Sequence, residues 1–390
     1  GESAIVGECY QDVSFARMLR HMLQTALPGR TVEVINAGIT AINSWAIMPF
    51  VRECVQYEPD LFVFYVGNNE AIGPYGPGVA GLTVGGRTII ATRQWVSSLK
   101  LYQLAQALGE RLGAGQQAPA WRGMELFAGR TWHPFDKRVR RTWRQLVVNL
   151  TQMRATAQQH GVPVVMCTLA ANIQDCAPFA SLHDPAGPPA RRDACAQETR
   201  KGWQLFEGGA YTAARSTFLN ARQADGWYAD ARYGYARACH ALHETNAAVT
   251  AYWEASVADA LQFRMPGYAN LDIRAAFRDI CADVEFACVA VSPMYVPGSS
   301  LLYDHVHFNL QGNYRAATTI FGAAAQRLHA PSGTVPPLDE VTRALGFTAF
   351  DERNALQQQR DFLRQPIFAR QRGHAARMQR MQTAWDEAAA

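Results

Sequence analysis

Short apolar runs alternate with amphipathic helical stretches along this 390-residue chain, and this alternation constrains its fold more than any other feature. The runs are too apolar for half-exposed antiparallel strands and predict strands buried on both faces. Strands separated by helices favour right-handed crossovers and a parallel sheet covered by helices. The predicted strands are Val32–Ala37, Leu61–Val66, Val162–Leu169 and Phe286–Val291, and the predicted helices are Ser14–Leu27, Ser44–Tyr57, Arg138–His160 and Leu310–His329.

Two insertions interrupt this alternation. The first, residues 71–136, opens with a Gly/Pro-rich loop and continues into a helical segment near Arg93–Leu112. A substrate-facing lid and a surface excursion without function explain it equally well. In the second, the pattern Tyr211–Asp225 recurs as Thr245–Asp259, offset by 34 residues, the period of tetratricopeptide helix pairs. An ordinary Ala-rich helical hairpin is the alternative.

The domain organisation that follows is a body interrupted by helices. We assign residues 1–199 and 263–330 to the body, residues 200–262 to the tetratricopeptide-like insertion, and residues 331–390 to a linker and a helical tail. Stacked helices of this kind commonly form a concave binding surface or a cap over a neighbouring site. Residues 200–262 are therefore the predicted contact for a protein partner.

Composition excludes several classes of protein. With 48% hydrophobic and 18% charged residues the chain is globular, and it contains no apolar run long enough for a membrane-spanning helix. The net charge of +4 is spread along the chain, so we expect no nucleic-acid partner. The eight cysteines form no CxxC pair, which argues against a zinc site and a dense disulfide framework. We expect neither a metal nor a cofactor.

Residues at the ends of the predicted elements supply the groups needed for acyl transfer. Ser3 is a hydroxyl nucleophile, His307 is a base, and Asp304 lies three residues before that histidine and can orient its imidazole. The oxyanion of a tetrahedral intermediate needs fixed donors. The candidate donors are the backbone N–H groups of Ser3 and Gly38 and the side-chain amide of Asn69.

Several of these assignments have a competitor. Ser3 taken alone is more simply a helix cap. His305 competes with His307 for the role of base, and Asn68 competes with Asn69 for the amide.

Three further residues follow the strand Val162–Leu169 and are candidates for the pocket lining: Asn172, Asp175 and His183. Capping and turn formation are their alternative roles. Three aromatic residues are candidates for pocket walls, although aromatic residues near strand ends are more often core: Trp45, Tyr65 and Tyr75.

Four blocks in this order resemble the SGNH (GDSL-type) hydrolases: Gly-Glu-Ser at residues 1–3, Gly38, Gly67-x-Asn69-Glu70 and Asp304-x-x-His307. More narrowly, the chain is similar over nearly its whole length to bacterial members with inserted tetratricopeptide helices, in which stretches like YVGNNE and DHVHFNLQGNY recur. The resemblance implies a flavodoxin-like three-layer α/β/α fold with an inserted helical segment. It also implies the roles stated above for Ser3, Asp304, His307 and the three oxyanion donors.

The chain departs from the family pattern in two respects. Glu2 and Glu70 stand where the family has Asp, which keeps the charge and changes its reach by one methylene. The family's first strand should precede Gly1, so we expect a longer natural chain, and a defective sheet and a poorly held Ser3 in these residues alone. Relatives often carry an upstream hydrophobic anchor, which favours a periplasmic or membrane-anchored location.

The predicted function is a serine ester hydrolase that cleaves a small-molecule, glycan or lipid ester through an acyl-Ser3 intermediate. One alternative is an O-acyltransferase that uses the same acyl-enzyme. The other is a binding or assembly module in which residues 200–262 recruit a partner and the hydrolase half is vestigial. The sequence leaves the ester, the location and any membrane contact open.

Overall fold

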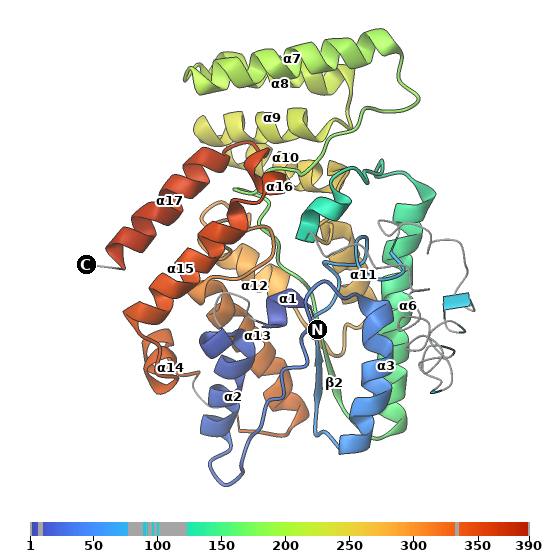
Figure 1. Cartoon of the computed structure of the whole chain (residues 1–390), viewed down its shortest axis with the longest axis vertical. Helices are drawn as coiled ribbons and strands as arrows, with labels where there is room; N and C mark the ends of the chain where they lie inside the picture. The colour runs from blue at the N-terminus through green and yellow to red at the C-terminus, as the bar shows by residue number, and fades with distance from the viewer. Residues whose placement is uncertain are drawn as a thin grey trace, which may run out of the picture.

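The structure is a computed structural model that describes residues 2–6, 11–76, 123–331 and 335–388, together with positions 89, 90, 92, 96 and 100. The expected lid, residues 71–136 with a helix near Arg93–Leu112, lies largely outside the described residues. Within the described part of the chain, helices far outnumber strands (Figure 1).

The first elements along the chain, up to β2, are α1 Ser3–Val6, η1 Gln11–Val13, α2 Phe15–Ala26, α3 Ser44–Cys54, η2 Val55–Tyr57, β1 Phe62–Phe64, η3 Gly123–Phe127, α6 Lys137–Gln159 and β2 Val164–Cys167. Those that follow, up to α12, are α7 Pro189–Glu207, α8 Tyr211–Ala224, α9 Ala229–Ala241, α10 Thr245–Ala258, α11 Gly267–Ala276, β3 Cys281–Ala282 and α12 Val284–Val291. The last are α13 Leu310–Arg327, α14 Leu338–Ala344, α15 Ala349–Leu363, α16 Pro366–Ala369 and α17 His374–Glu387.

The sheet is short and parallel. Its strand order is β1-β2-β3, with Phe62 opposite Val164 and Met166 opposite Cys281. Helices α2 and α13 pack together on one side of it, and α3 and α6 lie on the other (Figure 1). The main core is formed by apolar side chains from the sheet and these helices, among them Met18, Leu146, Val165, Met166 and Ile320.

The fold class expected from the sequence is wrong. The described chain is mainly helical with a three-stranded sheet, and it is not a clear flavodoxin-like three-layer α/β/α fold. The three strands contain only three, four and two residues. The predicted helices form, as α2, α3 with η2, α6 and α13, so the error lies in the strands.

Two of the four predicted strands do not form. Phe286–Val291 lies in helix α12, because the Asp283 side chain accepts the N–H of Phe286 and caps the helix. Helix α12 then buries Val284 and Cys288, four residues apart, and leaves Phe286 64% exposed. Val32–Ala37 has no regular secondary structure, and its Ile35 is 78% exposed. An apolar run alone therefore did not distinguish a strand from a capped helix or a surface segment.

The internal repeat falls on two equivalent helices. Helices α7 to α10 stack in chain order at one end of the molecule (Figure 1), and α8 and α10 carry the two copies of the repeat. The aromatic repeat residues Phe218 and Tyr252 are fully buried, as are the alanines that flank them. Gly234 of α9 faces the Phe218 ring so closely that a Cβ atom would clash with it. Glycine and alanine thus let these helices approach.

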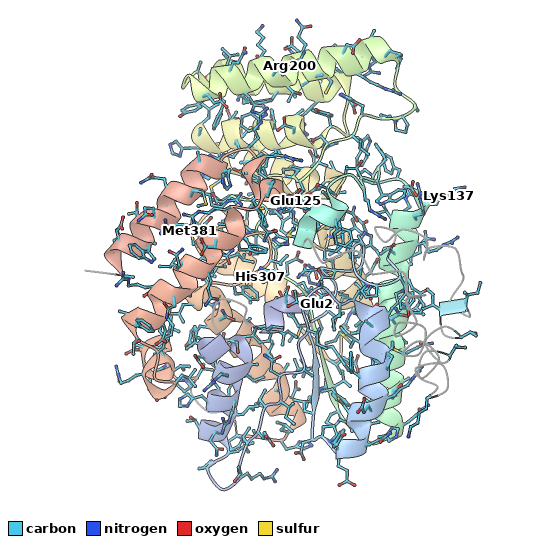
Figure 2. All side chains as sticks on the ribbon, in the orientation of Figure 1. Glu2, Glu125, Lys137, Arg200, His307 and Met381 are labelled. Carbon is cyan, nitrogen blue, oxygen red and sulfur yellow. The ribbon has the colours of Figure 1, made fainter. Side chains whose placement is uncertain are left out.

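The C-terminal helices pack back on the body through an apolar cluster of their own. The buried members of this cluster include Phe263, Leu356, Leu363, Phe368 and Met381. Figure 2 shows Met381 on these helices, Arg200 on the outer helical stack, and Glu2 and His307 near the centre of the molecule. In the part of the chain that the structure describes, none of the helices is long and apolar enough to cross a membrane.

Candidate active site

Ser3, His307 and Asp304 form a continuous hydrogen-bonded array. Ser3 opens α1, and the other two lie on the loop between α12 and α13. The Ser3 Oγ atom is 2.9 Å from His307 Nε2, and His307 Nδ1 is 2.6 Å from Asp304 Oδ2. Ser3 is 8% exposed, His307 7% and Asp304 0%. The structure therefore brings together the three residues that the sequence predicted as a triad, from positions about 300 residues apart.

The loop that carries Asp304 and His307 is held by its own hydrogen bonds. Asp304 Oδ1 accepts the backbone N–H groups of Val306 and His307, at 2.8 and 2.9 Å. The Tyr303 N–H donates to the His307 carbonyl at 2.9 Å, which closes the loop. Burial would raise the pKa of the Asp304 carboxyl, but the neighbouring imidazoles and their hydrogen bonds hold that pKa well below its usual range. Asp304 is therefore a carboxylate that can orient His307 and stabilise an imidazolium.

Glu2 anchors the segment that carries Ser3. Its buried carboxylate accepts the backbone N–H groups of Gly67, Asn68 and Asn69, at 2.7, 2.9 and 3.2 Å. Burial raises the pKa of Glu2 to about 7, although the three hydrogen bonds oppose the shift. The residue before Ser3 is thus tied to the loop after β1. This contact holds Ser3 in place, where the sequence had led us to expect a poorly held side chain.

Glu70 fixes the far end of the same loop. Its carboxylate accepts the Ser44 N–H at 2.6 Å and the Ser44 hydroxyl at 2.9 Å, and Asn149 donates to that hydroxyl at 2.8 Å. Burial raises the pKa of Glu70 to about 8. The two glutamates therefore connect the loop to α1, α3 and α6.

Asn69 presents a donor without an acceptor. The Asn69 Nδ2 atom is buried and has no hydrogen-bond partner among the described residues, although its backbone N–H is held by Glu2. A buried amide donor without a partner costs about 1–3 kcal/mol, so it is expected where a ligand supplies the acceptor. The Nδ2 atom of Asn68 is also unpartnered within the described chain, while its Oδ1 accepts the Met265 N–H. The competition between the two asparagines therefore stays open.

Gly38 lies beside α1, but its N–H is already engaged. A Cβ atom on Gly38 would come within 3.0 Å of the Val6 backbone nitrogen, so the segment approaches α1 closely. The Gly38 N–H donates to the Asn36 side-chain oxygen at 3.0 Å, and Asn36 Nδ2 donates to the Ile5 carbonyl at 2.7 Å. In this structure Gly38 would have to exchange that bond before it could serve an oxyanion.

His305 is buried beside the array and contacts the same carboxylate. Its Nδ1 atom lies 3.2 Å from Asp304 Oδ1, and its ring meets the His307 ring edge to face at 5.8 Å. Burial lowers the pKa of His305, although Asp304 opposes the shift. His307 bridges Asp304 and Ser3, so the geometry favours His307 as the base. His305 is an enclosed imidazole whose Nδ1 atom approaches the carboxylate but has no hydrogen-bond partner among the described residues.

The predicted pocket residues separate in space. Asn172 donates its N–H to the His305 carbonyl at 2.9 Å, and its Nδ2 atom is buried without a partner in the described chain. Asp175 Oδ2 accepts the Ser299 N–H at 2.8 Å, which ties the segment after β2 to the loop before Asp304. Asn172 therefore adjoins the candidate site, and Asp175 connects elements around it.

The aromatic candidates do not form one wall. Tyr65 is fully buried, and its ring packs 5.5 Å from that of Phe15, so it belongs to the core. Trp45 lies in α3 and Tyr75 follows the Glu70 turn, and both are half-buried.

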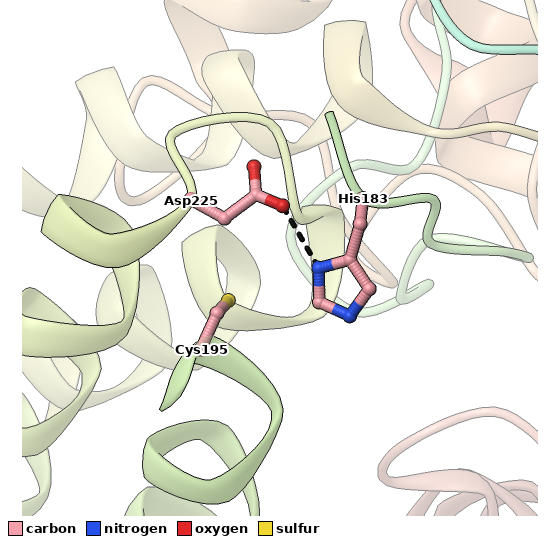
Figure 3. Close-up of side chains that lie close together, drawn as sticks. All are labelled: His183, Cys195 and Asp225. Carbon is pink, nitrogen blue, oxygen red and sulfur yellow. Dashed lines mark hydrogen bonds and ion pairs between the residues drawn. The ribbon is translucent and has the colours of Figure 1, made fainter. Parts of the chain in front are cut away.

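His183 belongs to a second cluster, next to the helical stack. Its Nδ1 atom is 2.8 Å from Asp225 Oδ2, with Cys195 close by (Figure 3). In the described part of the chain, these residues and the set Asp304, His305 and His307 are the groups whose ligand atoms lie close enough to hold a cation. Burial raises the pKa of the Cys195 thiol to about 11, so in the absence of a metal it is protonated at neutral pH. We interpret the cluster as a hydrogen-bonded contact between His183 and Asp225.

Sequence reasoning missed one residue of the candidate site, Gln359. Its Nε2 atom donates to Asp304 Oδ2 at 2.7 Å from α15, a helix of the C-terminal tail. Gln359 lies 55 residues after Asp304 in an Arg/Gln-rich stretch. In the sequence, Gln359 stands at helical spacing from Leu356 and Leu363, and this position on the apolar face of the helix is the signal that could have indicated its burial.

Comparison of the chain with protein-family models, curated proteins and solved structures gives no match.

Proposed function

We propose that this protein is a serine ester hydrolase that works through an acyl-Ser3 intermediate. The observation that carries the proposal is the array Ser3 Oγ to His307 Nε2 to Asp304, with distances of 2.9 and 2.6 Å. A serine hydroxyl is a weak nucleophile unless a base accepts its proton, and this array provides that base with an orienting carboxylate. The resemblance to SGNH hydrolases stays a prediction beside it, without the fold that it implied.

In the first half-reaction, the Ser3 oxygen attacks the ester carbonyl carbon and His307 Nε2 takes the hydroxyl proton. Asp304 accepts a hydrogen bond from His307 Nδ1–H, which selects the tautomer with a free Nε2 and stabilises the imidazolium. The imidazolium then donates the proton to the departing alkoxide. The acyl group is left on Ser3.

The oxyanion of each tetrahedral intermediate needs donors aimed at it. The Nδ2–H of Asn69, unpartnered within the described residues, supports a role in this site, and the Ser3 N–H is the second candidate donor. Removal of one such donor typically costs about 10²–10³ in kcat. In the second half-reaction, His307 removes a proton from water, the hydroxide attacks the acyl carbon, and Ser3 leaves as the alcohol.

The test is a comparison of the wild type with Ser3→Ala. The wild type is expected to hydrolyse a short p-nitrophenyl ester and to react with a fluorophosphonate at Ser3, located by peptide mass spectrometry. Ser3→Ala should lose both reactions. Ser14→Ala, which replaces a buried serine outside the array, is the control and should keep them. Labelling at another residue, or full hydrolysis by Ser3→Ala, would refute the proposal.

An O-acyltransferase is the second candidate, because the same acyl-Ser3 intermediate would serve it. A sugar or glycan hydroxyl bound at the site would then accept the acyl group in place of water. Mass spectrometry of the products with and without a sugar acceptor distinguishes the two, because only a transferase yields the acylated sugar as its main product.

The proposed partners are a substrate at the candidate active site and a protein at the helical stack. The substrate is a small-molecule, glycan or lipid ester, and a protein partner would contact the helices within residues 200–262. A pull-down with the full chain, compared with a variant altered on the exposed face of these helices, tests the second proposal.

A further inference from the structure

The Asp304 carboxylate is held from the C-terminal tail as well as from its own loop. Its Oδ2 atom accepts one hydrogen bond from His307 Nδ1, at 2.6 Å, and another from Gln359 Nε2, at 2.7 Å. Gln359 is 1% exposed and belongs to α15. The oxygen that faces the imidazole is therefore shared between the base and a distant amide.

Aromatic contacts fix this part of the tail against the array. The Phe362 ring meets the His307 ring nearly edge to face, with centroids 5.8 Å apart, and the Phe368 ring lies 5.6 Å from that of His305. Phe362 and Phe368 also pack on each other at 5.0 Å. Helix α15 begins with a capping box formed by Thr348 and Asp351. The contact of Gln359 with Asp304 is thus part of a packed interface.

The amide has a defined physical effect on the carboxylate. The other oxygen of Asp304 is fixed by two backbone N–H groups, whereas Oδ2 is held by the imidazole and by Gln359. A second donor fixes the direction of the Oδ2 lone pairs and with it the plane of the imidazole. The Gln359 amide also offsets part of the negative charge of the fully buried Asp304 carboxylate, which would otherwise interact with the imidazole alone.

We infer that Gln359 is a positioning residue that acts through Asp304 and His307, an inference that rests on the proposed function. The C-terminal helices would then complete the active site.

The test compares Gln359→Glu and Gln359→Met with the control Gln358→Met. Glutamate keeps the size and, beside a buried carboxylate, keeps a proton that it can donate, whereas methionine keeps the unbranched stem and loses the donor. Gln358 is the exposed neighbour on the same helix. The readouts are kcat and KM for a p-nitrophenyl ester, and the rate of fluorophosphonate labelling of Ser3 from pH 5 to 9. Circular dichroism and thermal unfolding identify the variants that fold.

Gln359→Met is expected to lower kcat about tenfold or more with little change in KM, because a mispositioned base weakens the transition state and not ester binding. Loss of the donor leaves more of the Asp304 charge to hold the proton on His307. The acid limb of the labelling profile should therefore move to higher pH by about half a unit or more in Gln359→Met, and by less in Gln359→Glu, which keeps a donor. The other titratable or charged groups nearby are His305, Arg264 and Glu2, which all variants share.

The outcomes separate this inference from the function on which it rests. Wild-type kcat and acid limb in folded Gln359→Met would overturn the role of Gln359, even if Ser3→Ala abolishes labelling. A lower unfolding temperature with an unmoved acid limb would show a structural role only and would also overturn it. If the wild type does not label at Ser3, the proposed function and this inference fail together. Gln358→Met should behave as the wild type.

Discussion

The loops around Ser3 and the helical stack α7 to α10 both contain fully buried side chains, yet these are held by opposite means. Around Ser3, carboxylates of Glu2 and Asp304 each accept several backbone or side-chain donors. In the stack, rings such as Phe218 fill the space left by alanine and glycine. Loss of a group from the first region leaves a buried partner unsatisfied, whereas loss from the second leaves a cavity. Substitutions in the two regions should therefore fail in different ways.

The largest effect is expected for Asp304→Ala. His307 would lose the acceptor that selects its tautomer, and the kcat of ester hydrolysis should fall about 10⁴-fold, as in other serine triads. The exposed Asp279, which pairs with Arg154, provides the control Asp279→Ala, and its activity should stay near that of the wild type. Equal activity of the two variants in a p-nitrophenyl ester assay would exclude Asp304 from the proposed mechanism.

Phe218→Ala tests the other side of the comparison. It removes a fully buried ring between α8 and α9, and the cavity should lower the free energy of unfolding by about 3–5 kcal/mol. The labelling rate of Ser3 in the folded protein should change little. Urea unfolding measures the first and fluorophosphonate kinetics the second. Leu219→Ala, at a partly exposed neighbour, is the control for stability. A large loss of labelling with unchanged stability would contradict the separation of the two regions.

Two features of the structure could be predicted from patterns in the sequence. The order of the motifs identified Ser3, Asp304 and His307, because acyl transfer requires particular side chains and a short Asp-to-His spacing. The amphipathic helices were predicted because burial of one face imposes a period of about 3.6 residues. Both signals are local, and the structure contains the corresponding array and helices.

The rest depended on hydrogen bonds that the apolar pattern and the motifs do not reveal. Phe286–Val291 is apolar enough for a buried strand, but the Asp283 cap begins a helix there. The N–H of Gly38 is engaged by Asn36, an interaction between neighbours that the motif did not reveal. Gln359 reaches Asp304 only because the tail folds back over the site. Local hydrogen bonds decided the first two cases, and tertiary packing decided the third.

Glu70→Gln tests whether ionisation of the buried loop limits stability. The pKa of Glu70 is raised from 4.5 to about 8, so between these values the folded protein holds a proton that the unfolded chain releases. Stability should therefore be present at low pH and fall as pH rises through about 8, by at most about 1.4 kcal/mol per unit. Glutamine keeps the acceptor for the Ser44 N–H without ionising, and its NH₂ group would donate to the Ser44 hydroxyl oxygen. Urea unfolding from pH 5 to 9 should show a weaker decline in Glu70→Gln, with the decline that remains arising partly from Glu2. Glu58→Gln, at an exposed site, should match the wild type, and an unchanged decline in Glu70→Gln would contradict this account.

The smallest effect is expected at a place where the two modes of support meet. His183 donates to Asp225, whose carboxylate also accepts the N–H groups of Asp184 and Trp227. Because those two donors stay in place in His183→Ala, the carboxylate keeps hydrogen-bond partners. The free energy of unfolding should therefore fall by only about 1 kcal/mol. Urea unfolding of His183→Ala measures this loss, with His160→Ala, at an exposed histidine, as the control. A loss as large as that of Phe218→Ala, or one that appears only without a chelator, would mean that His183, Cys195 and Asp225 bind a cation, and that the helical stack too depends on buried charge.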